Sequence, residues 1–291
     1  MEHFRSIMLM VVKFFFVSLG LILISGFIGL FTNGISMNFK QYILNVWEII
    51  RSLSNPGEMT ITNELGNTYP MFPTFWAYYN YSLIIFLGSL LLAVMIAFIL
   101  TFMTIRLPRK LSAYLLKVLS LLESIPDIFI IIIIQFTVIV TFKRTGILLA
   151  PVAGGNDPVY ILPIVTLSIL PTIFIFKLLL LFVEDEMTKP YVELAESKGL
   201  GKVYIFSMHI IRNFSSSLMN HMKSFILILL SNLIVFERLF NIYGLTHFIL
   251  AFPQIDVICF SLILFYVPIF IILTAIGIFI RLKTGQEGVA T

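Results

Sequence analysis

Two acidic residues, Glu123 and Asp127, have the type and spacing that most suggest chemistry in this sequence. They flank Ser124-Ile125-Pro126 inside a long apolar stretch. Side chains at positions i and i+4 share one face of a helix, and a charge near the bilayer centre costs about 2.5–3.5 kcal/mol on insertion scales. We therefore predict that both acids face a polar path. Two alternatives are a helix that begins later, leaving both acids in the membrane interface, and an intramembrane enzyme that uses them as an acid pair with raised pKa values.

Other patterns that would indicate catalysis or cofactor binding do not occur in the sequence. The four histidines, His3, His209, His221 and His247, are scattered and lack the H-E-x-x-H spacing of a zinc site. There is no G-x-S-x-G nucleophile turn and no P-loop for ATP. The single cysteine, Cys259, excludes a disulfide within the chain and is typical of a packing residue. We therefore expect a chain that is not an enzyme and holds no metal or cofactor of its own.

The composition indicates a membrane protein. The chain has 291 residues, of which 59% are hydrophobic and only 12% are charged. A soluble domain carries about 25% charged residues to cover its surface, so most of this surface is expected to meet lipid. The net charge of +4 is small and no dense basic run occurs, which argues against a nucleic-acid partner.

Six apolar segments approach or exceed the ~20 residues that a helix needs to cross a bilayer. The predicted spans are Met8–Phe31, Tyr81–Met103, Leu119–Thr141, Tyr160–Val183, Met222–Phe236 and Asp256–Ile280. This divides the chain into a first transmembrane helix (1–32), an extracytoplasmic segment (33–80), a core of five helices (81–283) with a polar loop at 184–221, and a cytoplasmic tail (284–291). Most of the 19 basic residues then fall on the side of both termini, and the positive-inside rule predicts that side to be cytoplasmic.

The segment from Tyr191 to Asn213 is the main polar stretch between these spans, and its pattern predicts two short helices. Pro190 suits the first position of a helix. Tyr191, Leu194 and Ala195 then form an apolar stripe at i, i+3 and i+4. Gly199 is suited to the left-handed conformation that ends a helix. A segment of this kind is typical of a docking element at a membrane surface.

This segment resembles the coupling loop of permease subunits in binding-protein-dependent ABC importers. The loop pattern is Glu-Ala-Ala, three residues, then Gly, and Glu193-Leu194-Ala195 followed by Gly199 matches it with one replacement. Further positions are similar to the dipeptide, oligopeptide and nickel branch, in particular its B-type subunit: Tyr191, Lys198, Leu200, His209, Arg212 and Asn213. The sequence departs from that branch at Ser217 and Tyr243, where proline is usual.

The resemblance implies an all-α integral membrane fold of six transmembrane helices, the type I ABC importer permease fold with a cytoplasmic coupling helix. The implied partners are a second, homologous permease, cytoplasmic ATPase subunits that bind ATP and Mg²⁺, and an extracytoplasmic solute-binding protein, all at the cell or inner membrane. Contact with the ATPase is implied for Tyr191, Glu193, Leu194, Ala195, Gly199, Leu200, His209, Arg212 and Asn213. The implied cargo is a peptide or, alternatively, nickel or a metal chelate. A competing hypothesis is an ion-driven secondary transporter, which would favour inverted repeats.

Polar residues in two spans are candidates for the translocation path. The Ser-Ile-Pro triplet between Glu123 and Asp127 resembles the family at the corresponding place. Asn232 lies inside the fifth span, where an amide either packs helices together or lines a pore. Glu237, at the outer end of that span, is a candidate gate, the alternative being an ion pair with Arg238. The predicted path residues are Glu123, Ser124, Pro126, Asp127, Asn232 and Glu237.

Overall fold

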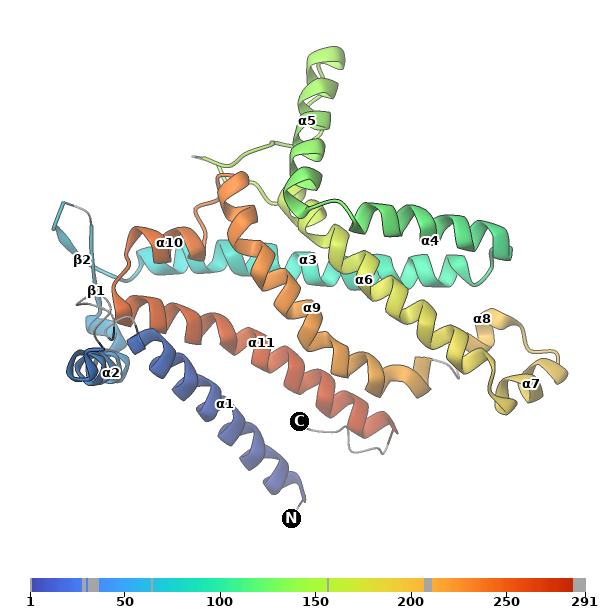
Figure 1. The fold of residues 1–291 in the computed structure, drawn as a ribbon, viewed down its shortest axis with the longest axis horizontal. Coiled ribbons are helices and arrows are strands. Elements are labelled where there is room, and N and C mark those ends of the chain that lie inside the picture. The colour runs from blue at the N-terminus through green and yellow to red at the C-terminus, as the bar shows by residue number, and fades with distance from the viewer. Residues whose placement is uncertain are drawn as a thin grey trace. The chain divides into compact units, whose positions relative to one another are not determined.

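The fold was analysed in a computed structural model, which describes residues 2–27, 30, 37–63, 65–155, 157–206 and 211–284. The chain is mostly helical and divides into two compact units. Unit 1 comprises Met1–Leu83 and Tyr243–Thr274, and unit 2 comprises Ile84–Ile242 and Ala275–Thr291. Two long helices, α3 (Thr74–Thr104) and α11 (Ile255–Thr284), contribute residues to both units (Figure 1).

Unit 1 combines helices with a small hairpin. Its elements are α1 (Glu2–Gly26), α2 (Phe39–Ser54), the single turn η2 (Pro56–Glu58), strands β1 (Thr60–Thr62) and β2 (Thr68–Pro70), α10 (Leu245–Ala251), and the first parts of α3 and α11. The strands pair antiparallel with Ile61 opposite Tyr69. The core is aromatic: the fully buried Phe75 contacts the rings of Phe72, Tyr79, Phe248 and Phe260. Aromatic burial of this kind contributes a large share of packing energy.

Unit 2 is built around one long helix. Its elements are the rest of α3, α4 (Arg109–Glu123), α5 (Asp127–Thr145), α6 (Ile161–Met187), α7 (Pro190–Ser197), α8 (Lys202–Ile205), α9 (Ile211–Leu239) and the end of α11. Helix α6 packs against α4, α5 and α9. It also closely approaches α3, where a Cβ on Gly88 would come within 2.9 Å of the Ile164 side chain. Glycine at position 88 therefore permits this close approach of α3 and α6.

Five helices of the described chain are long and apolar enough to cross a membrane: Met8–Gly26, Thr74–Thr104, Asp127–Thr145, Ile161–Met187 and Ile255–Phe279. They overlap five of the six predicted spans and contain one of them, Tyr81–Met103, in full. The predicted fifth span, Met222–Phe236, lies within α9, which is not among the five. Its apolar stretch is interrupted by Asn232 and bounded by Lys223 and Glu237, so this span stays a prediction.

The predicted third span is wrong in its first half. Instead of one helix over Leu119–Thr141, α4 ends at Glu123 and α5 begins at Asp127. The physical reason is Pro126, which lacks an amide hydrogen and disfavours helical geometry in the residue before it. Glu123 and Asp127 therefore stand at the ends of two different helices and do not share a helix face. Figure 1 shows α4 and α5 running in different directions from this break.

Candidate functional site

The end of α6 is joined to α7 by a cluster centred on Glu186. This carboxylate is buried in the last turn of α6. It accepts a hydrogen bond from the Tyr191 hydroxyl and forms an ion pair with Lys189. Asp185 also contacts Lys189, with 3.7 Å between its Oδ2 and the lysine Nζ. Because hydrogen bonds to a charged group are stronger than neutral ones, this cluster fixes the direction in which α7 leaves α6.

The same cluster affects the protonation of Lys189. The hydrogen bond to the Glu186 carboxylate raises the pKa of Lys189 above its ordinary value of 10.5. A group whose pKa is higher in the folded state stabilises that state below the unfolded pKa and loses this contribution as pH rises through the folded pKa. Lys189 therefore carries its positive charge at neutral pH and loses it only in strongly alkaline solution.

The side chains that α7 buries are not those of the predicted apolar stripe. Val192 and Ala195 are buried against the chain, whereas Leu194 is 57% exposed. Glu193 is also exposed, and Tyr191 is half-buried. The predicted stripe of Tyr191, Leu194 and Ala195 is thus not one outward face. Ala195 is turned inward because it pairs at i, i+3 with Val192, a residue that the stripe omitted.

Gly199 ends α7 as predicted, in the left-handed region with φ of 78°. The Gly199 N–H donates to the Glu196 carbonyl at 2.9 Å, and the Leu200 N–H donates to the Ala195 carbonyl at 3.2 Å. This pair of bonds is the Schellman arrangement, which satisfies the last carbonyls of a helix. The chain then turns into α8, where Ile205 and the following Phe206 are buried.

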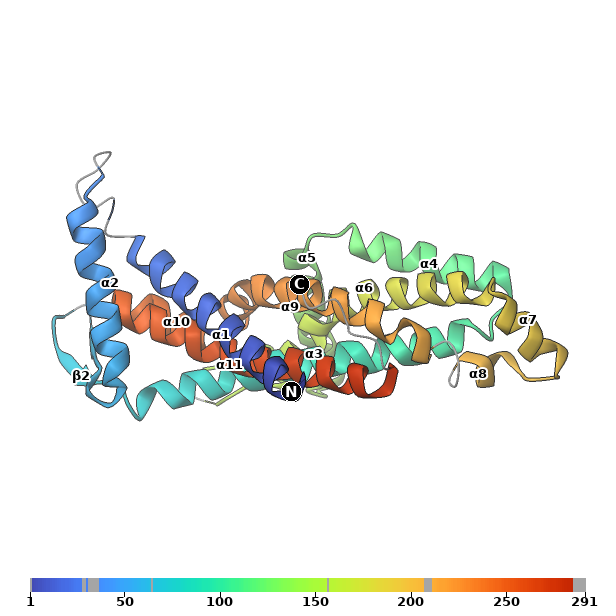
Figure 2. The ribbon, with the colours of Figure 1, turned by 90° about the horizontal axis from the view of Figure 1, so that it is seen from below.

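Three of the implied contact residues lie at the limit of what the structure describes. His209 falls outside the described residues. Arg212 and Asn213 belong to the first turn of α9, and their side chains are not described. Leu200 is half-buried after the helix end. The described part of the predicted coupling segment is therefore α7, its glycine cap and α8, which lie beyond the end of α6 in Figures 1 and 2.

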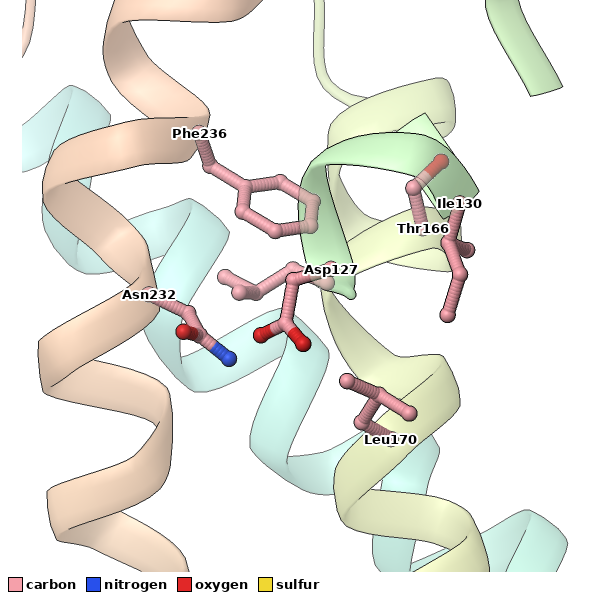
Figure 3. A pocket seen from close by; sticks show the side chains of 7 residues that line it. Asp127, Ile130, Thr166, Leu170, Asn232 and Phe236 are labelled. Atoms are coloured by element: carbon pink, nitrogen blue, oxygen red, sulfur yellow. The ribbon is translucent and has the colours of Figure 1, made fainter. Parts of the chain in front are cut away.

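A second group of predicted residues meets in a small pocket of unit 2. Asp127 of α5 and Asn232 of α9 point toward one another across it, as Figure 3 shows. The remaining lining comes from α5, α6 and α9: Ile130, Thr166, Leu167, Leu170 and Phe236. The buried Thr166 hydroxyl donates to the Leu162 carbonyl at 2.7 Å. The pocket thus combines a carboxylate, an amide and a hydroxyl oxygen in mostly apolar walls.

The other predicted path residues do not line this pocket. Glu123 forms an ion pair with Lys177 of α6, and Ser124 caps the end of α4 with its hydroxyl donating to the Ser120 carbonyl at 2.9 Å. Pro126 precedes α5 at its N-cap position. Glu237 is 1% exposed, whereas the neighbouring Arg238 is exposed.

The sequence analysis missed a group of hydrogen bonds at the C-terminal end of α9, called the polar clasp below. The Gln135 side chain of α5 donates to the carbonyls of Val152 at 2.9 Å and Leu239 at 3.2 Å. Asn241 donates from its side chain to the Gly154 carbonyl at 3.0 Å, and the Gly154 N–H donates to Phe240. A single amide within the apolar run of α5 was the signal available for this clasp. It ties the loop after α5 to the end of α9.

The five long apolar helices of the described chain are typical of a multi-pass membrane protein. A family model described as "Binding-protein-dependent transport system inner membrane component" matches residues 90–284, about two thirds of the chain. The chain belongs to this family and is a permease subunit of an ABC importer. Membership confirms the family resemblance and the multi-pass inner-membrane setting.

Proposed function

We propose that this permease subunit imports peptides and forms half of a translocation path with a second, homologous permease. The substrate class is supported by the residues similar to the dipeptide and oligopeptide branch, among them Tyr191, Lys198 and Leu200. Separate ATPase subunits bind ATP and Mg²⁺ on the cytoplasmic side, and an extracytoplasmic solute-binding protein delivers the cargo. Both termini of this chain are cytoplasmic in this proposal, which agrees with its basic residues.

One observation carries the coupling role: α7 is attached to a span by the buried Glu186. A helix that docks in a groove of an ATPase transmits motion only if its attachment to the membrane helix is stiff. Tyr191 and Ala195 hold α7 to this chain, while Glu193 and Leu194 are exposed for the partner. When the ATPase pair closes, α7 moves and α6 moves with it, so that the spans tilt as rigid bodies and alternate access to the path.

The test removes the charge of Glu186 and keeps its shape. In proteoliposomes that contain the assembled importer, Glu186→Gln is expected to lower uptake per ATP hydrolysed by about tenfold. Glutamine still accepts a hydrogen bond but carries no charge, and the difference between a charged and a neutral hydrogen bond, about 1–1.5 kcal/mol, corresponds to roughly tenfold. The matched control is Glu184→Gln, the same change at an exposed residue of the same helix end.

Two outcomes separate coupling from other roles. Unchanged coupling in Glu186→Gln would contradict the proposed attachment. Equal losses in Glu186→Gln and Glu184→Gln would assign the effect to the general charge of this loop. Peptide uptake that competes with unlabelled peptides, but not with nickel chelates, would support the proposed cargo class.

Within the path, we infer that the pocket of Asp127 and Asn232 contacts passing cargo. A carboxylate in a candidate span requires compensation, and a peptide carries an ammonium group at its amino end. The carboxylate, amide and hydroxyl oxygens of the pocket are acceptors that suit such a donor. This inference rests on the pocket geometry seen in Figure 3.

A further inference from the structure

Helix α2 has an apolar face that no part of the described chain covers. Its outward side chains recur at the spacing of one helix face: Phe39, Ile43, Trp47 and Ile50, together with Leu44. Trp47 is 66% exposed. Lys40, Glu48 and Arg51 are exposed along the same helix. An exposed apolar face flanked by cationic residues is the pattern of a helix that lies in a membrane interface.

The opposite face of α2 is packed against the protein. Asn45 and Ile49 are buried there. Gly26, the last residue of α1, lies so close that a Cβ on it would be 2.6 Å from Val46 and 3.4 Å from Tyr42. The inner face is therefore fixed at the end of α1, which leaves the face of Trp47 as the outer one.

The direction of α2 matches a membrane surface. Figure 1 shows α2 almost end-on while α11 runs close to the plane of that view, and Figure 2 shows α2 lengthwise with α1 sloping obliquely to it. Helix α2 thus runs across the direction of α11, whose residues Ile255–Phe279 form a candidate membrane span, and it packs at the end of another candidate span, Met8–Gly26 of α1. If these helices cross the bilayer, α2 lies closer to the membrane plane than to its normal, at the depth where α1 leaves the lipid.

We propose that α2 lies on the bilayer, with Phe39, Ile43, Trp47 and Ile50 inserted into the outer leaflet. Tryptophan prefers this boundary because its ring is apolar and its N–H is polar. Lys40 and Arg51 extend their charges toward the phospholipid headgroups. Helix α2 leads through Pro56–Glu58 into β1, so this seat also sets the height of the β1–β2 hairpin above the membrane.

Tryptophan fluorescence tests this proposal directly, because Trp47 and Trp76 are the two tryptophans of the chain. The full chain carrying Trp76→Phe is reconstituted in phosphatidylcholine vesicles brominated at either shallow or deep acyl positions. An apolar helix face inserts about 5–10 Å below the headgroup boundary, so shallow bromines are expected to remove roughly half of the Trp47 emission and deep bromines less. Aqueous iodide is expected to have little effect.

The control places a tryptophan in the same segment but away from lipid. Leu65→Trp in a background of Trp47→Phe and Trp76→Phe reports on the hairpin turn, where Leu65 is 84% exposed. This probe is expected to be quenched by iodide and not by bromolipid. Equal behaviour of the two probes would overturn the proposal.

Each remaining outcome for Trp47 also decides the question. Quenching by iodide without quenching by bromolipid would place the face in water and overturn the proposal. Protection from both would show that protein covers it, and a change on adding the solute-binding protein would name that cover. Should Trp76→Phe fail to insert, a spin label on Ile43→Cys in a Cys259→Ala background answers the same question, with oxygen access exceeding that of a water-soluble nickel chelate.

Discussion

At the scale of single residues, the structure separates two acids that look equivalent in the sequence. Asp127 lines a pocket with Asn232, while Glu123 pairs with Lys177 and lies at the end of another helix. Partly exposed ion pairs of the second kind contribute about 0–1 kcal/mol. The two carboxylates therefore differ in what surrounds them, which their spacing along the chain does not reveal.

We predict that Asp127→Asn lowers peptide uptake by about tenfold while ATP hydrolysis by the complex continues. The reason is that asparagine keeps an acceptor oxygen for the cargo ammonium but loses the charge, a difference of about 1–1.5 kcal/mol. The measurement is initial uptake of a labelled peptide into proteoliposomes. Glu123→Gln is the control and should transport nearly as the unmodified protein does, so an equal loss in both variants would argue against a path role for Asp127.

A histidine in place of Lys189 should make coupling depend on pH near neutrality. The native lysine is charged throughout this range, because its ordinary pKa of 10.5 already lies well above neutrality and the hydrogen bond to Glu186 raises it further. An ordinary histidine titrates at about 6.5, and a carboxylate neighbour raises this value. In Lys189→His the pair is present below the unfolded pKa and is lost as pH rises through the folded one, so uptake per ATP should fall between roughly pH 6 and 8. Lys198→His at an exposed position should show a flat profile.

At the scale of elements, the end of α7 depends on one backbone conformation. Gly199→Ala is expected to destabilise the turn by about 1–2 kcal/mol, because an L-residue is strained in the left-handed region. Gly201→Ala is a matched comparison, since an added Cβ meets open space at both positions but only Gly199 has a positive φ. Uptake per ATP and the thermal midpoint of the purified complex measure the effect.

Gly199→Asn offers a rescue, because asparagine tolerates the left-handed region better than other non-glycine residues. Coupling in Gly199→Asn should exceed that in Gly199→Ala. Identical behaviour of Gly199→Ala and Gly201→Ala would show that the left-handed turn has no part in coupling.

The elements that the sequence predicted well have local causes. Pro190 starts α7 and Gly199 ends it, as predicted, because each acts through its own backbone geometry. Hydropathy predicted one helix over Leu119–Thr141 because a single proline hardly changes the mean hydropathy of a segment. The backbone conformation does change at Pro126, and the helix breaks there.

The arrangement of the candidate site had causes that periodicity cannot express. The apolar residues of α7 were visible in the sequence, but the buried face of the helix was set by Val192 and Ala195 together. Glu186 was not predicted as part of the site because its contacts with Lys189 and Tyr191 exist only after the chain turns at residue 189. Likewise, Asp127 and Asn232 are distant in sequence and meet only through packing of α5 and α9 on α6.

At the scale of the whole molecule, the family match and the structural units do not have the same limits. The match covers residues 90–284 and so includes nearly all of unit 2. Residues before it contain α1, α2 and the hairpin of unit 1. Helix α7 with its Gly199 cap and the pocket of Asp127 and Asn232 both lie in the matched part, whereas α2 lies outside it. The residues of the proposed coupling and path roles and those of the proposed membrane-surface helix therefore lie in different stretches of the chain.

Helix α6 is more buried than the other candidate spans, with the consecutive buried runs Thr166–Ser168 and Pro171–Ile173, although Val165, Phe174 and Leu181 are exposed. Its final turn holds Glu186, so in the proposed mechanism a movement of α7 driven by the ATPase would enter unit 2 through the helix that packs against α4, α5 and α9. Because these three helices pack against α6, a displacement of α6 would displace them too. A movement that begins at α7 would then become a concerted rearrangement of the helix packing inside unit 2.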